Sequence, residues 1–210
     1  MSKATTPAVA VVLSFAAGAT DAFAFLQLGG IFTANMTGNL ILVGLYQRPN
    51  YLTTLIGASV AVVAFALVTY LGFRVRNARV LLVVATVVQA LVLAGYAVAD
   101  RPLGRLWLCV FIALSAVAMA CQTVIGRTIE ARSGVTTTFV TGTLTSLMQS
   151  LANGRTEFRT VRILSILALV AGALVGALAI TGDPLLGAAL PLVPSVVALA
   201  LLPGVSVPSA

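Results

Sequence analysis

Apolar residues dominate six long runs of this chain, and short polar stretches separate the runs. Each run comes close to the roughly 20 residues that a helix rising about 1.5 Å per residue needs to cross about 30 Å of hydrocarbon. Water cannot satisfy backbone groups there, so the pattern predicts helices. The predicted spans are Thr6–Leu28, Tyr51–Phe73, Val80–Ala99, Leu106–Ile125, Arg162–Thr181 and Leu185–Leu202.

Two further apolar segments, Phe32–Tyr46 and Thr136–Leu151, are shorter than these spans and rich in Thr, Asn and Gly. This composition favours half-helices or re-entrant segments. The two segments also match each other at a constant offset of 104 residues, with five identities in eleven positions. The matching pairs are Gly30 and Gly134, Thr33 and Thr137, Thr37 and Thr141, Gly38 and Gly142, and Leu40 and Leu144.

The repeated segments divide the chain into two similar halves. Residues 6–99 form repeat one and residues 106–202 form repeat two, each with one span, one short segment and two more spans. Together they predict a single transmembrane domain over residues 1–210. With three spans per repeat, the second half would be inverted relative to the first, and the short segments would enter from opposite faces and meet near the midplane.

The basic residues support this topology. If the short segments do not cross, nine of the 12 Lys and Arg residues share one side and three lie opposite; if they cross, the split is seven to five. The positive-inside rule favours the first arrangement, with both termini cytoplasmic. Because only 8% of the residues are charged, against about 25% in soluble domains, a soluble fold is excluded. The net charge of +7 lies in loop clusters between apolar runs, so no nucleic-acid site is expected.

Asp21 is the only acidic residue within a predicted span, since Asp100, Glu130, Glu157 and Asp183 are predicted to lie in loops. A carboxylate at membrane depth is costly and usually marks an ion or proton path. The alternative is a structural role, in which Asp21 caps the next segment or braces the break at Gly29 and Gly30. We expect nearby polar side chains to donate hydrogen bonds to it. The candidate donors are Asn35, Thr37, Asn39 and, from the opposite repeat, Gln122.

The start of each short segment is a second candidate site. Helix N-termini present free N–H groups and bind anions in broken-helix transporters. The candidate ligands for a substrate or ion are Asn35, Thr37, Gly38 and Asn39 in the first segment and Thr137, Thr138, Thr141, Gly142 and Thr143 in the second. Thr and Gly also mediate tight helix packing, and Gln122 could simply join two helices. The Gly172 and Gly176 pair fits either a contact within the fold or a homodimer.

Enzymatic chemistry has little support in this sequence. The chain has no histidine, which removes the usual general base and the commonest metal ligand. Aspartyl catalysis would need a second carboxylate in the spans. Cys109 and Cys121 lie in one apolar run, about 18 Å apart along a helix, and cannot pair. We therefore expect no enzyme, no metal and no cofactor.

At the motif residues the chain resembles the YoaK-type family of small bacterial integral membrane proteins, a domain of unknown function. The residues that carry the first motif are Gly18, Asp21, Ala22, Phe25, Leu26 and Gly29, continuing into Phe32 and Ala34 to Asn39. The second motif is carried by Gln122 and by the run from Thr137 to Leu144. The resemblance implies a multi-pass protein of the bacterial cytoplasmic membrane and gives no activity.

The function predicted from these features is transport of a small polar or anionic solute, coupled to a proton or cation through Asp21. The lipid bilayer and an unknown small solute are the expected partners. Two alternatives stay open. A channel could use the same opposed half-helices as a constriction. A structural or assembly protein would carry similar polar packing motifs.

Overall fold

The structure is a computed structural model that describes residues 5–133 and 140–201, and all regular secondary structure in those ranges is helical. Six segments are long and apolar enough to span a membrane. They are α1 (Thr5–Gln27), α3 (Tyr51–Gly72), α4 (Ala78–Val98), α5 (Arg105–Ser133), α7 (Arg159–Gly182) and the pair α8 (Pro184–Ala189) and α9 (Leu192–Leu201). Two shorter helices follow α1 and α5, namely α2 (Met36–Gly44) and α6 (Val140–Ala152). The predicted all-helical membrane fold is confirmed for the described residues.

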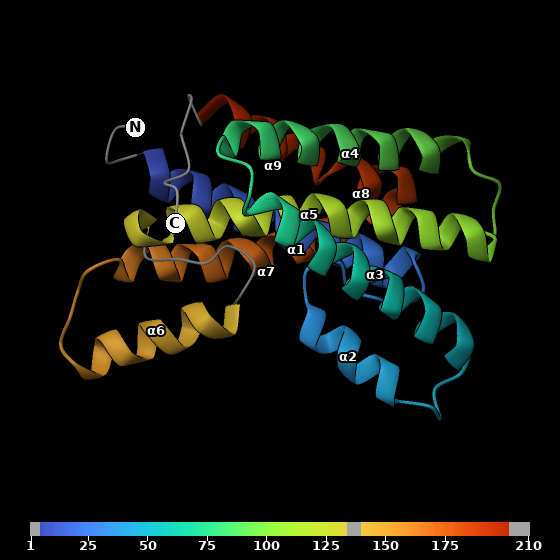
Figure 1. Cartoon of the computed structure of the whole chain (residues 1–210), viewed down its shortest axis with the longest axis horizontal. Coiled ribbons are helices and arrows are strands. Elements are labelled where there is room, and N and C mark those ends of the chain that lie inside the picture. The colour runs from blue at the N-terminus through green and yellow to red at the C-terminus, as the bar shows by residue number, and fades with distance from the viewer. Residues whose placement is uncertain (1–4, 134–139, 202–210) are drawn as a thin grey trace.

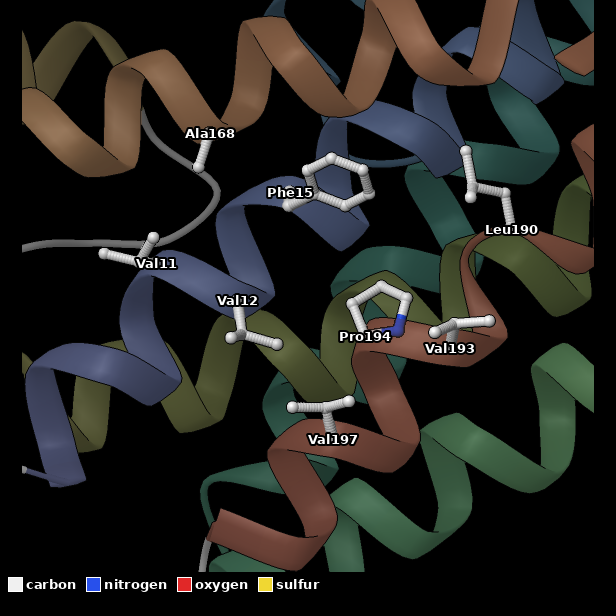
Figure 2. Close-up of a pocket in the computed structure, with 8 residues that line it drawn as sticks. All are labelled: Val11, Val12, Phe15, Ala168, Leu190, Val193, Pro194 and Val197. Carbon is white, nitrogen blue, oxygen red and sulfur yellow. The ribbon is translucent and has the colours of Figure 1, made fainter.

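Helices α1 and α5 form the centre of the bundle and are the most buried spans. Helix α1 packs along α7 and against α9, whereas α5 packs along α3 and α4 (Figure 1). A further contact joins α4 to α9. Each central helix therefore packs mainly on helices from the other half of the chain. Helices α4 and α5 are also neighbours in sequence. The two halves are interleaved, and the interior contains two hydrophobic clusters that each draw on helices from both halves.

Glycines bring α1 and α7 into backbone contact. A Cβ atom on Gly18 would collide with the carbonyl oxygen of Leu169, and one on Gly172 would collide with that of Phe15. A Cβ on Gly176 would lie 3.3 Å from Ala19 Cα. Small residues allow such close approach of membrane helices, where dispersion forces drive association. The Gly172 and Gly176 pattern therefore serves a contact within the fold.

Helices α2 and α6 lie beside the long helices on the same side of the molecule (Figure 1). Helix α2 packs on α3 and α6 packs on α7. In Figure 1 each runs outward from the middle of the bundle, α2 toward one end and α6 toward the other. A side chain of the following span holds each of these two short helices in place by a hydrogen bond. The Tyr51 hydroxyl donates to the carbonyl oxygen of Val43 at 2.8 Å, and the Arg162 guanidinium donates to that of Ser146 at 3.2 Å.

Two span predictions need correction. Helix α5 continues to Ser133, so Glu130 lies on a helix and pairs with Arg127 at 3.0 Å, one turn away, instead of lying in a loop. A polar helical extension is stable there because i,i+3 charge pairs support it. The last predicted span is broken between α8 and α9 at Leu190 and Pro191. Proline has no N–H to donate and interrupts the helical ladder.

Candidate functional site

The candidate site begins where α1 ends. Gly29 and Gly30 have φ values of 87° and 74°, which only glycine adopts at little cost, and the chain between α1 and α2 is not helical. The guanidinium of Arg48, from the segment between α2 and α3, lies directly against Gly30 and would collide with a Cβ there. These two glycines let residues 28–35 turn back alongside the end of α1.

Asp21, on the last two turns of α1, binds this turned-back segment. Its Oδ1 atom accepts hydrogen bonds from Thr33 N at 2.7 Å, Thr33 Oγ1 at 3.0 Å and Ala34 N at 2.9 Å. Successive N–H groups before a helix form a concave anion-binding nest, and hydrogen bonds to a charged acceptor are strong. The half-buried Asp21 carboxylate fills that nest.

Asn39 holds the same segment from the other side. Its Nδ2 donates to Phe32 O at 2.7 Å, and its Oδ1 accepts from Phe32 N at 3.0 Å. The side-chain amide thereby makes the pair of hydrogen bonds with Phe32 that a neighbouring strand would make in a sheet. Asn39 itself is fully buried, so these bonds satisfy its side-chain amide away from water.

The remaining residues of this motif form the start of α2. Asn35 is the N-cap, and its Oδ1 accepts from Gly38 N at 3.1 Å. A Cβ on Gly38 would lie 3.0 Å from both Asn35 Nδ2 and Phe32 Cδ2, so glycine leaves the Phe32 ring room to cover this turn. Thr37 is exposed. The motif thus encodes a capped helix start, and Thr37 is its freely accessible hydroxyl-bearing position.

The side chains that were predicted to donate hydrogen bonds to Asp21 were the wrong ones. The side chains of Asn35 and Asn39 bond to Gly38 and Phe32, while backbone N–H groups and the Thr33 hydroxyl bond Asp21. The physical reason is that N–H groups ahead of a helix lack partners of their own and outnumber the nearby side-chain donors.

Gln122 does not join this cluster either. Its Nε2 donates to Ser195 Oγ on α9 at 3.2 Å, and that hydroxyl lies 2.6 Å from Gln89 Oε1 on α4. The bundle therefore contains a second polar cluster, separate from Asp21, that joins α4, α5 and α9. Gln122 belongs to it because its position on α5 faces α9.

The second short segment is described only from Val140 onward. Thr143 is buried, whereas Thr141 and Gly142 are exposed. The carbonyl oxygen of Thr141 accepts a bond from Thr145 Oγ1 at 2.8 Å. The candidate residues Thr137 and Thr138 lie outside the described residues.

Three contributing residues were absent from the sequence-based site. Thr33 supplies two of the donors to Asp21, and it is one of the five positions repeated at offset 104. Gln89 and Ser195 complete the cluster around Gln122. Gln89 stands alone as an amide in an apolar run, a signal that was present in the sequence.

The fold and the apolar spans define a multi-pass, all-helical membrane protein. The chain belongs to the family described as "Protein of unknown function (DUF1275)", whose profile matches residues 9–202. It is 30% identical over 184 residues to the UPF0700 transmembrane protein YoaK of Bacillus subtilis (strain 168), covering 80% of this chain and 81% of the relative. No solved structure matches the chain significantly. The resemblance to YoaK-type proteins is therefore confirmed.

Proposed function

We propose that this protein transports a small polar solute and that Asp21, with the N–H groups of Thr33 and Ala34, forms the part of its site that a proton or cation opens. The observation that carries the proposal is the three hydrogen bonds that converge on Asp21 Oδ1 from a non-helical segment beside a span. Asparagine could accept the same bonds without the cost of a charge in the membrane. Retaining a carboxylate therefore favours a role for the charge itself.

The same contacts suggest how a proton or cation would act. Charge-assisted hydrogen bonds weaken when their acceptor is neutralised. Protonation or cation binding at Asp21 would weaken its bonds from the N–H groups of Thr33 and Ala34, and a polar group of the solute would then compete with Asp21 as their acceptor. Because the carboxylate already occupies this nest, the geometry favours a polar solute over an anion.

An inverted repeat is part of the proposal, and the packing of the helices supports it. If α1 corresponds to α5, α3 to α7 and α4 to the pair α8 and α9, the contact of α1 with α7 corresponds to that of α5 with α3. The contact of α4 with α5 likewise corresponds to that of α9 with α1. The opposite directions of α2 and α6 in Figure 1 fit two re-entrant half-helices.

The proposed orientation places both termini in the cytoplasm of a bacterial cell. Helix α1 begins and α9 ends at the same end of the bundle (Figure 1). The arginines in the connecting segments and adjoining helix turns at that end are Arg74, Arg76, Arg79, Arg127, Arg155, Arg159 and Arg162, against Arg48, Arg101 and Arg105 at the other end. The positive-inside rule assigns the richer end to the cytoplasm.

Reconstitution of the purified chain in liposomes tests transport against the alternatives. A panel of small polar solutes is first screened for those that raise the unfolding temperature, since a ligand that binds only the folded state stabilises it. Uptake of each such solute is then measured with and without a proton gradient. A transporter gives saturable, gradient-dependent uptake. Non-saturating flux would indicate a channel, and neither stabilisation nor flux would indicate a structural protein.

A further inference from the structure

The break between α8 and α9 lies beside the second polar cluster. Leu190 and Pro191 separate the two helices, and Ser195 follows one turn later. Its hydroxyl oxygen lies 2.9 Å from the carbonyl oxygen of Pro191 and 2.6 Å from Gln89 Oε1. One hydroxyl hydrogen can bond only one of these two acceptors at a time. The cluster is therefore short of a donor at this point.

Two further polar atoms in the cluster have no hydrogen-bond partner among the residues that the structure describes. Gln89 Nε2, a donor, and Gln122 Oε1, an acceptor, are both buried and unbonded. Gln89 is 4% exposed, and Gln122 and Ser195 are 0% exposed, so neither bulk water nor lipid headgroups reach them. Buried polar groups without hydrogen bonds are costly and rare, and ordered water commonly satisfies them.

We propose that Gln89, Gln122 and Ser195 form an enclosed binding site for a neutral hydroxyl group, carried either by a water molecule or by a small solute. Such a group can accept from Gln89 Nε2 and donate to Gln122 Oε1, and it would thereby supply two of the bonds that the cluster lacks. No charged side chain takes part in the hydrogen bonds of this cluster. The chemistry therefore selects a neutral ligand.

The site is independent of Asp21, because its three residues lie on α4, α5 and α9, away from the segment before α2. Gln89 and Ser195 are also 106 residues apart, close to the repeat offset, and sit on helices that the proposed repeat makes equivalent. A neutral site where equivalent helices of the two halves meet is well placed to select a solute by hydrogen bonding.

Nuclear magnetic resonance of the full chain in lipid nanodiscs tests the site directly. The chain contains five glutamines, so ¹⁵N-glutamine labelling gives a small set of side-chain amide signals. Gln47 is exposed in the segment between α2 and α3 and provides the reference signal of an amide that exchanges with solvent. The proposal predicts a magnetisation-transfer cross-peak between the Gln89 amide protons and a bound hydroxyl proton that is distinct from bulk exchange.

Glycerol, a neutral hydroxyl solute, distinguishes the two sources. If the ligand is water alone, the Gln89 and Gln122 signals stay unchanged on titration and the water cross-peak persists. If a solute hydroxyl binds, both signals shift saturably and the water cross-peak declines. Either result supports the site. Absence of any hydroxyl cross-peak at Gln89, with no response to glycerol, would overturn it.

Two variants test which residues the cross-peak at Gln89 depends on. Ser195→Ala removes the hydroxyl that joins the Gln89 and Gln122 side chains, so the two amides should no longer hold the ligand and the cross-peak between Gln89 and the bound ligand should be lost. Thr86→Val is the matched control, since Thr86 lies one turn earlier on α4 and its hydroxyl donates to the carbonyl oxygen of Leu82 in the same helix at 2.8 Å. The control should retain the cross-peak. Loss of the peak in Thr86→Val but not in Ser195→Ala would contradict the assignment, and the wild-type measurement stands even if Ser195→Ala fails to fold.

Discussion

The side-chain amide of Asn39 makes both hydrogen bonds of a backbone pair with Phe32, donating to its carbonyl oxygen at 2.7 Å and accepting from its N–H at 3.0 Å. This relationship fixes the segment that carries the donors to Asp21, because Phe32 immediately precedes Thr33. The geometry of the candidate site therefore depends on Asn39, although the hydrogen bonds to Asp21 Oδ1 come from Thr33 and Ala34.

Asn39→Ala should destabilise the protein more than Asn35→Ala. The first variant leaves two part-buried backbone groups of Phe32 without their partner, at up to about 1–3 kcal/mol each. The second removes an exposed N-cap worth about 0.5–2 kcal/mol. Equilibrium unfolding in mixed detergent micelles measures both. The reverse order would show that Phe32 finds other partners.

Gly172→Ala should disrupt the packing of α1 on α7, because the added Cβ meets the backbone carbonyl of Phe15, which cannot move aside as a side chain can. We expect a loss above about 3 kcal/mol, at or beyond the usual range for overpacking. Gly182→Ala, at the end of the same helix, is the matched control, since nothing lies within 4 Å of its added Cβ. Folding yield and unfolding temperature compare the two variants, and equal behaviour would contradict the close contact.

Single cysteines should react from opposite sides of the membrane when placed at Arg48 and Arg155. These residues lie in the segments that follow α2 and α6, which run toward opposite ends of the bundle. The background carries Cys109→Ala and Cys121→Ala, so that only the introduced thiol reacts. A cysteine at Arg101 is the control and should label from the same side as the one at Arg48. Labelling of the Arg48 and Arg155 positions from one side would exclude the inverted repeat.

The spans could be predicted from the sequence because the thickness of the hydrocarbon layer sets the length of an apolar run. Hydropathy carries no information on hydrogen bonding, however. The break at Pro191 within the last span was therefore missed, although the proline is present in the sequence. The polar extension of α5 was missed for the opposite reason: a helix can continue past the apolar run when charge pairs support it.

The candidate site was predicted in part. The cost of a carboxylate in a span singled out Asp21, and the structure shows it braced against the segment that follows the glycine break. Its partners could not be read from residue types because two of the three donors to Oδ1 are backbone N–H groups. Side-chain identity says nothing about where such groups point. The cluster of Gln89, Gln122 and Ser195 depends on which faces of α4, α5 and α9 meet, and only the packed bundle defines that.

Asp21→Leu should lower stability, because the variant leaves the N–H groups of Thr33 and Ala34 and the Thr33 hydroxyl without their acceptor, at about 1–3 kcal/mol each when they are shielded from water. Asp21→Asn keeps an oxygen acceptor and the side-chain shape, so it should unfold close to the wild-type temperature. Thermal unfolding of both variants separates the role of the scaffold from that of the charge. Equal losses would mean that the carboxylate is purely structural.

The most direct test of the account is gradient-driven uptake by the Asp21→Asn variant in proteoliposomes, using a solute identified by its stabilisation of the wild-type protein. We predict that the variant folds, still binds the solute and loses accumulation against its gradient, because the titrating charge that would couple transport is gone. Full coupled uptake by Asp21→Asn would contradict the central claim and leave Asp21 as a brace for the segment before α2.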